Sequence, residues 1–384
     1  MIRYVDRKHT DCSKWDNLGA MFGREDLQAM WVADMDFRCP DCVIEAIRQY
    51  ADFGVFGYYK PHESYVQAFL DWEETHHGYR VQRDWVRFAP GVVPAVNWLL
   101  QILTEPDEAV IVQTPVYYPF LDAVRNNGRT LVCSDLIDTD GVYTVDFEDF
   151  ERKITEHGVK LFILSSPHNP VGRVWTPDEL RLMLEICRRH GVYVLSDEIH
   201  HDLTFDGAVH VPTLSVAKET DRIIMLTAAS KTFNIAALKN SFVVIKDPEL
   251  RDAWDRFVTG LRIGWGNPLG YIACEAAYRY GSPWLSEVKE VIWNNYKYIW
   301  DEFSAHLPEV RMTPLEATYL AWADFSAYLA PEEVQPFMQD KCHLAFDYGS
   351  WFGGNKSGSF IRINLATSRE NIEEAVGRIV SALI

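Results

Sequence analysis

Residues 160–200, KLFILSSPHNPVGRVWTPDELRLMLEICRRHGVYVLSDEIH, decide the fold class. Two short apolar runs in this stretch, Lys160–Leu164 and Val192–Leu195, are bounded by turn residues and are too short to be buried helices. Between them, a Thr-x-x-Glu capping box begins at Thr176, with proline at the first helical position. A strand, a helix and a second strand in this order predict parallel strands joined by a crossover helix, which is an α/β fold.

The same alternation continues on both sides of this stretch. Short runs rich in Val, Ile and Leu recur from about residue 109 and are separated by longer segments of helical character. The further predicted strands are Ala109–Gln113, Thr130–Cys133, Arg222–Leu226 and Phe242–Ile245. We therefore expect a large domain in which helices flank a mainly parallel sheet.

A second domain is indicated beyond residue 281. There the strand and helix alternation loosens, and a long amphipathic segment, Pro283–His306, precedes a mixed α/β tail. We expect a large domain of residues 46–281 and a smaller α/β domain that combines residues 1–45 with residues 282–384.

The composition excludes several classes of function. The chain has 384 residues and a formal net charge of −18, which would repel phosphate backbones and anionic membranes. Neither an apolar run of about 18 residues nor a signal-peptide core is visible, so we expect no membrane span and a cytoplasmic location. The seven cysteines are odd in number and scattered, so we expect reduced thiols.

Polar side chains follow three of the predicted strands. Asn169 lies in the segment after Lys160–Leu164, Asp197 comes directly after the next strand, and Lys231 follows Arg222–Leu226. Because ligands bind at the carboxyl ends of strands in open parallel sheets, these groups should converge. An amide, an acid and an amine suit pyridoxal 5'-phosphate (PLP): the acid keeps the ring nitrogen protonated, and the amine forms an imine with the aldehyde.

Two further segments provide groups for the rest of this cofactor. Pro90-Gly91-Val92-Val93-Pro94 opens an apolar helix, and its free backbone N–H groups can bind a phosphate, with Gly91 permitting close approach. The segment Thr114–Pro119 follows a predicted strand and carries Tyr117, which we expect to lie over the ring.

Seven motifs together link the sequence to a known family. They are Trp31–Phe37, Phe56–Tyr58, Pro90–Pro94, Ser166–Trp175, Ser196–His200, Ser230–Asn234 and Glu316–Leu320. With these motifs, nearly the whole chain resembles the class I/II aminotransferase superfamily of fold-type I PLP enzymes. Within that superfamily it is similar to the MalY/PatB-type cystathionine β-lyases, also called cysteine-S-conjugate β-lyases.

The resemblance implies roles for individual residues. Lys231 would attach the cofactor and act in catalysis with Tyr117, Asp197 would pair with the ring nitrogen, and Asn169 would bind the ring 3-oxygen. Arg362 would clamp the substrate α-carboxylate, a task that suits a planar bidentate donor.

Other positions would complete the site. The residues that we expect beside the cofactor are His200, Gly91, Val92, Val93, Ser230 and Lys239, and those that we expect beside the substrate are Ala33, Asp34 and Asn169. Tyr58 would reach the cofactor of a second subunit, which implies a homodimer with its active site at the interface. Ala228 stands where a phosphate-binding serine is common, a loss for which Ser230 or Thr227 could compensate.

Structural interpretations compete with some of these assignments. Arg362 lies on an apolar strand, so either a structural carboxylate or a substrate must meet its charge. Residues Asp197–Asp202 could be a metal cluster, but no His-x-x-x-His spacing accompanies them, so no metal is expected. Cys39 and Cys42 lack the βαβ context of a redox pair, and His76 with His77 is expected to face solvent from a loop.

The expected activity is the cleavage of cystathionine or a related cysteine S-conjugate to a thiol, pyruvate and ammonia. The same scaffold also supports aminotransferases, and a PLP-holding protein with a regulatory or interaction role is a further alternative. The motif Trp31–Phe37 and His200 favour the lyase.

Overall fold

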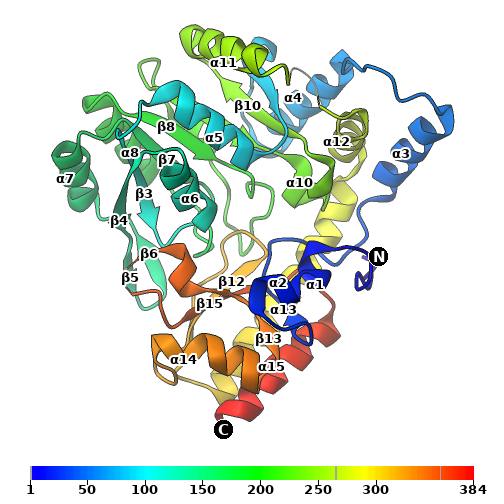
Figure 1. The fold of residues 1–384 in the computed structure, drawn as a ribbon, viewed down its shortest axis with the longest axis vertical. Coiled ribbons are helices and arrows are strands. Elements are labelled where there is room, and N and C mark those ends of the chain that lie inside the picture. The colour runs from blue at the N-terminus through cyan, green and yellow to red at the C-terminus, as the bar shows by residue number, and fades with distance from the viewer. Residues whose placement is uncertain (1, 264–265, 355) are drawn as a thin grey trace.

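Two separate sheets organise the chain. The computed structural model describes residues 2–263, 266–354 and 356–384. A seven-stranded sheet fills the upper part of Figure 1, and a four-stranded sheet lies below it, close to the C-terminus. The expected α/β class is confirmed.

The large sheet has the strand order β2-β10-β9-β8-β7-β3-β4. Its strands are β2 (Val86–Ala89), β3 (Ala109–Thr114), β4 (Thr130–Asp135), β7 (Leu161–Ser165), β8 (Tyr193–Asp197), β9 (Ile223–Thr227) and β10 (Ser241–Ile245). All six strands predicted from the apolar runs are confirmed. The strand β2 was missed, because the charged side chain of Arg87 interrupts its short apolar pattern.

Strand direction agrees with the prediction at one end of the sheet and differs at the other. The strands β4, β3, β7, β8 and β9 are parallel to one another, whereas β10 is antiparallel to both β9 and β2. A parallel return needs a crossover of a dozen or more residues, usually a helix. Between β9 and β10 the chain forms only short turns of helix, which include α10 (Ala229–Thr232).

Helices cover both faces of the large sheet. Val110 and Val112 of β3 belong to an apolar cluster with α5 (Val92–Leu103) and α6 (Tyr118–Asn126), while Ile111 faces the opposite cluster with α8 (Pro177–Arg189). The longer helices of this part are α3 (Asp41–Phe53), α4 (Glu63–His77), α5 (Val92–Leu103), α6 (Tyr118–Asn126), α7 (Phe147–His157), α8 (Pro177–Arg189), α11 (Pro248–Leu261) and α12 (Pro268–Tyr280). The capping box of Thr176 and Glu179 is present at the start of α8, as predicted.

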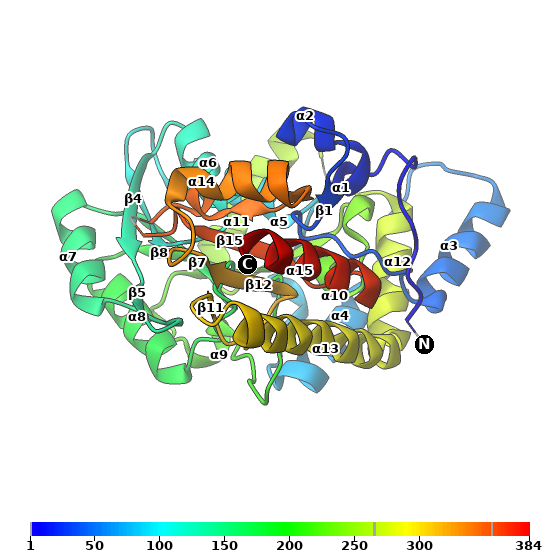
Figure 2. The ribbon, with the colours of Figure 1, turned by 90° about the horizontal axis from the view of Figure 1, so that it is seen from below.

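The small sheet has the strand order β11-β12-β15-β14. Its strands are β11 (Arg311–Met312), β12 (Leu320–Asp324), β14 (Asp347–Tyr348) and β15 (Phe360–Asn364). The long helices α13 (Ser282–His306) and α15 (Arg369–Leu383) pack against each other beside it (Figure 2). The amphipathic segment predicted at Pro283–His306 is therefore the helix α13.

Short elements complete the chain. These are α1 (Ser13–Asp16), α2 (Leu18–Phe22), α9 (Thr213–Val216), α14 (Pro331–Pro336), the hairpin of β5 (Ile137–Thr139) and β6 (Val142–Thr144), and the parallel pair of β1 (Gln28–Ala29) and β13 (Leu344–Ala345). In the part of the chain that the structure describes, none of the helices combines the length and apolarity needed to cross a membrane.

The two-domain division stays a proposal. The pairing of β1 with β13 ties the N-terminal segment to the C-terminal part, which supports a small domain built from both chain ends. Residue 45, however, lies inside α3, and α3 packs against α12 of the large part. We therefore propose that the boundary lies at Pro40, the residue that precedes α3, and not at residue 45.

Candidate active site

The three polar groups predicted at the sheet edge come together there. Asp197 is the last residue of β8, Asn169 follows β7, and Lys231 lies on α10 directly after β9. The register aligns Ser165 with Asp197 and Asp197 with Leu226, so the three strands end side by side. The common edge follows from the parallel direction of these strands.

Lys231 points toward the N-terminal segment. Its Nζ donates a hydrogen bond of 2.5 Å to the backbone carbonyl of Ala33. Desolvation in the site lowers the pKa of Lys231 to about 8, against the opposing effects of the Asp34 and Asp197 charges. An amine with a lowered pKa is neutral more often near neutral pH, which is the form that attacks a carbonyl.

Asp197 is a buried carboxylate with little local compensation. It is 7% exposed, and within the described residues its side chain accepts one hydrogen bond, from the backbone N–H of Ile199 at 3.1 Å. Desolvation raises the pKa of Asp197 to about 7. A protonated ring nitrogen beside it would supply the missing counter-charge.

Arg362 meets both an amide and a carboxylate. Its Nη1 donates to Asn169 Oδ1 at 2.9 Å, and its Nη2 pairs with Asp347. Asp347 lies directly opposite Arg362 in the pairing of β14 with β15, and both side chains are almost fully buried. The Nε of Arg362 has no hydrogen-bond partner, so the guanidinium keeps free donor capacity. Sequence reasoning did not identify Asp347.

Tyr117 and His200 lie at the same edge. Tyr117 precedes α6, and its backbone N–H donates to the carbonyl of Asn169 at 3.0 Å. Burial raises the pKa of Tyr117 to about 12, so its hydroxyl keeps its proton. His200 is buried and packs edge-to-face on Tyr319, and its Nδ1 has no hydrogen-bond partner. Desolvation holds the pKa of His200 well below its usual range, so this ring is neutral.

The helix α5 presents free donors beside this group. Gly91 is its N-cap, and the first bond inside the helix runs from the N–H of Ala95 to the carbonyl of Gly91. The N–H groups of Val92 and Val93 precede that bond, so they have no partner within the helix. These groups favour an anion.

The other expected phosphate contacts have mixed surroundings. Ala228 is buried directly before α10 and offers no hydroxyl. The hydroxyl of Thr227 lies 3.2 Å from His201 Nε2 and is fully buried, so Thr227 is a poor substitute. Ser230 is half-buried on α10, whereas Lys239 is exposed, with a positive φ of 53°.

The motif Trp31–Phe37 is held against the site by asparagines. Asn234 donates to the carbonyls of Met35 and Phe37, at 3.0 and 2.8 Å. Asn364 donates to the carbonyls of Val32 and Asp34, at 2.7 and 2.8 Å. These bonds fix Ala33 above Lys231, while the Asp34 side chain pairs with Arg7 at 2.8 Å. The roles of both asparagines were not predicted from the sequence, although Asn234 lies in the motif Ser230–Asn234.

Tyr58 stands apart from these groups. It is fully exposed, in the segment between α3 and α4, and Phe53, Val55 and Phe56 beside it are also exposed. Within one chain Tyr58 therefore does not join the site.

Other features that the sequence raised are resolved by the geometry. The seven cysteines form no disulfide. The expected loop is wrong for both His76 and His77, which form the last turn of α4. His76 is exposed as expected, but the side chain of His77 is 6% exposed and pairs with Asp202. The helix continues to His77 because the glycine that ends it, Gly78, comes after it.

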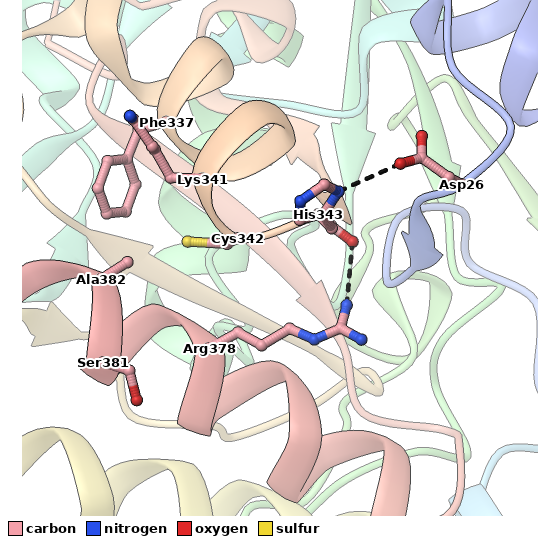
Figure 3. Close-up of a pocket in the computed structure, with 8 residues that line it drawn as sticks. All are labelled: Asp26, Phe337, Lys341, Cys342, His343, Arg378, Ser381 and Ala382. Carbon is pink, nitrogen blue, oxygen red and sulfur yellow. Dashed lines mark hydrogen bonds and ion pairs between the residues drawn. The ribbon is translucent and has the colours of Figure 1, made fainter.

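A pocket of about 720 Å³ lies away from the strand ends. Figure 3 shows it between α15 and the segment before β13, where Asp26 pairs with His343 and Arg378 donates to the His343 carbonyl. Its lining shares no residue with the group of Lys231, Asp197 and Asn169 at the strand ends.

The groups at the strand ends fit PLP. The amine of Lys231 can hold an aldehyde, the uncompensated carboxylate of Asp197 can pair with a protonated ring nitrogen, and the start of α5 can bind a phosphate. The unpartnered polar atoms of His200 and Arg362 lie at the same edge and remain available to a ligand. This set of donors and acceptors matches the functional groups of the cofactor.

Comparisons with known proteins agree with this geometry. The model of the family described as aminotransferase class I and II matches residues 30–379. The chain is 40% identical to cystathionine beta-lyase PatB of Bacillus subtilis (strain 168), over 98% of each sequence. It is similar to the structure of cystalysin from Treponema denticola, which contains pyridoxal 5'-phosphate, with 36% identity, a TM-score of 0.95 and coverage of 99% of this chain and 98% of that one. It is also similar to the PLP-bound C-S lyase from Staphylococcus hominis, with 32% identity, a TM-score of 0.94 and coverage of 100% and 97%. The chain belongs to the aminotransferase class I and II family.

Proposed function

We propose that this protein is a PLP-dependent carbon–sulfur β-lyase that converts cystathionine or a related cysteine S-conjugate to a thiol, pyruvate and ammonia. The observation that carries the proposal is the contact of Lys231 with the Ala33 carbonyl, because it joins the cofactor-binding amine to the motif Trp31–Phe37. The full-length similarity to a cystathionine beta-lyase supports the same conclusion.

The proposed roles around the cofactor follow from charge and proton position. When bound, PLP supplies an aldehyde that condenses with amines and a ring that accepts the electrons released at the substrate α-carbon. Lys231 holds the cofactor until an amino acid displaces it, and its free amine then takes the α-proton. Asp197 keeps the ring nitrogen protonated, which is the state in which the ring accepts electrons best.

The rest of the cradle positions the cofactor. The N–H groups of Val92 and Val93, after Gly91, bind the phosphate, and Ser230 and Lys239 add to this contact. Tyr117 packs on the ring, and its protonated hydroxyl can donate to a substrate group. Asn169 and the neutral ring of His200 would hold the ring on the side of its 3-oxygen.

The substrate is oriented through its α-carboxylate. The Nε of Arg362 is unpartnered and Nη1 uses one N–H for Asn169, so a carboxylate can bind without displacing Asp347. The backbone at Ala33 and Asp34 closes the site above Lys231. The electron pair left by the α-proton forms a double bond to the β-carbon as the β-thiolate departs. Hydrolysis of the remaining fragment then gives pyruvate and ammonia.

A homodimer is part of the proposal. The exposed apolar side chains of Phe53, Val55, Phe56 and Tyr58 form a surface that a second copy of the chain would cover. Tyr58 of one subunit would then reach the cofactor phosphate of its partner. The variant Tyr58→Phe tests the two roles separately. Its sedimentation should still show a dimer, because a phenyl ring preserves the apolar contact, whereas its affinity for PLP should fall.

A cytoplasmic location is also proposed. It is supported by the seven cysteines, none of which is paired, since free thiols persist in a reducing compartment.

The number of turnovers without an amino-group acceptor tests the reaction type. Elimination regenerates the starting enzyme, so we expect many turnovers of L-cystathionine per active site and none in Lys231→Ala. A transamination leaves the amino group on the cofactor, so it would stop after about one turnover per site and resume when a keto acid is added. That second result would assign the protein to the aminotransferases instead.

A further inference from the structure

A buried group of histidines and carboxylates lies behind the active-site loop. Glu73 and His77 are one turn apart on the same face of α4, and both face His201, which follows β8. One candidate ligand atom from each of the three residues lies within 4.8 Å of the other two. None of these residues has a role in the proposed lyase reaction.

Glu73 is the unexplained member of this group. It is fully buried in the interior face of α4, and neither of its carboxylate oxygens has a hydrogen-bond partner. Its nearest ionisable contact is His201, with Oε1 3.9 Å from Nε2. A buried carboxylate without donors is costly, so the site requires a cation or a proton there.

The two imidazoles are held in orientation by Asp202. The rings of His77 and His201 are stacked, with centroids 4.2 Å apart. The two oxygens of Asp202 lie 2.8 Å from His77 Nε2 and 3.4 Å from His201 Nε2. Trp72 and Thr232 also donate to Asp202, at 2.9 and 2.6 Å. Because His201 Nε2 faces both Glu73 and Asp202, Asp202 lies beside the candidate ligand atoms and not behind them.

Negative charge exceeds fixed positive charge in this region. Glu73, Glu198 and Asp202 are all buried, and their ion pairs among the described residues are with histidines alone. Glu198 is already satisfied by Ser196, by the N–H of Thr213 and by His210. Glu73 is therefore the carboxylate of this group that lacks a neutralising partner.

We propose that Glu73, His77 and His201 bind one divalent metal ion of the zinc class. Imidazole nitrogens with one carboxylate oxygen are ligands that zinc prefers, at bond lengths of about 2.0–2.2 Å. Ligand atoms around one such ion lie at most about 4 Å apart, a spacing that the pair of Glu73 and His201 already has. The three ligand atoms, which lie within 4.8 Å of one another, must therefore come closer by less than about 1 Å. A small movement of the His77 side chain, on the last turn of α4, is enough for this.

The ion would have a structural role. It would tie α4 to the loop that follows β8, which begins after Asp197 and carries His200 of the active site. Asp202 extends this connection to Thr232, the neighbour of Lys231. The binding of metal should therefore stabilise the active-site loop without contacting the substrate.

Metal content of the untagged, PLP-loaded protein tests the proposal. The protein is produced with added zinc, passed over a weak chelating resin and analysed for metal and PLP per chain. We expect about one metal ion per chain in the wild type and at least a tenfold lower content in Glu73→Gln and His201→Asn. Glu74→Gln is the matched control, since Glu74 is the next residue on α4 but is exposed and pairs with Arg80.

Thermal stability provides a second readout. Prolonged treatment with a strong chelator should lower the melting temperature of the wild type and of Glu74→Gln, and added zinc should restore it. In Glu73→Gln neither treatment should change it, while retained PLP absorbance reports that this variant is folded. Wild-type protein without bound metal would overturn the proposal, and so would a Glu73→Gln variant that keeps its metal. Either result would mean that a proton, and not a metal ion, neutralises Glu73.

Discussion

Asp347 is the residue whose replacement should reveal most about the site, because it neutralises Arg362 in the interior. Both side chains are almost fully buried, and they lie opposite each other in the pairing of β14 with β15. Removing one partner of a buried ion pair usually costs about 3–5 kcal/mol, because the other charge stays buried. Asparagine keeps an acceptor oxygen beside Arg362. We therefore expect Asp347→Asn to lower the free energy of unfolding by about 3 kcal/mol, at the lower end of that range.

The chain offers a control of the same chemistry with different burial. Asp255 binds Arg87 through both of its oxygens, at 2.6 and 2.8 Å, but its side chain is 46% exposed. Exposed pairs contribute about 0–1 kcal/mol, so Asp255→Asn should have little effect. The combined change Asp347→Leu with Arg362→Met should recover most of the loss, because an apolar pair replaces both buried charges.

Equilibrium unfolding in urea, followed by tryptophan fluorescence, measures these free energies. The PLP concentration is held constant, because a bound cofactor shifts the apparent stability, and circular dichroism must give the same transition. The reasoning is refuted if Asp347→Asn and Asp255→Asn differ by less than about 1 kcal/mol. It is equally refuted if the double change is no more stable than Asp347→Asn alone.

Three further predictions concern Asp197, Asn234 and Arg362. Burial raises the pKa of Asp197 to about 7 in the folded protein, so its contribution to the stability of the cofactor-free protein is present below about pH 4. That contribution is lost as the pH rises to about 7, and a series of urea titrations should show that Asp197→Asn removes this part of the pH dependence. Asn234→Gly tolerates the positive φ of that position but loses two donated bonds, worth about 1 kcal/mol each, so hydrogen exchange of residues 31–37 should accelerate at least tenfold. Arg362→Lys should raise KM for the amino acid about tenfold or more, because an ammonium cannot bind a carboxylate in the bidentate way, and an unchanged KM in steady-state assays would argue against the clamp.

The positions of Lys231, Asp197 and Asn169 could be predicted from the sequence because each follows an apolar run of strand length. In a parallel sheet such runs end at one edge, so their order along the chain determines which side chains converge. The capping box at Thr176 is similarly local, and the helix α8 begins where that signal predicts.

Contacts between distant segments gave no such signal. The strand β14 has two residues, too few to show a periodicity, so the pairing of Asp347 with Arg362 emerges only from the folded sheet. The burial of Glu73 and His77 depends on how α4 packs against the loop after β8. Their Glu-x-x-x-His spacing was the one local hint, and it is weak without a partner such as His201.

The release of thiol and pyruvate from L-cystathionine, followed together without any keto acid, shows directly whether this protein is a carbon–sulfur β-lyase. We expect the PLP-loaded protein to form the two products continuously and at equal rates. Lys231→Ala should form neither. Pyruvate without thiol, or no products until a keto acid is supplied, would contradict β-elimination of a sulfur group as the activity of this protein.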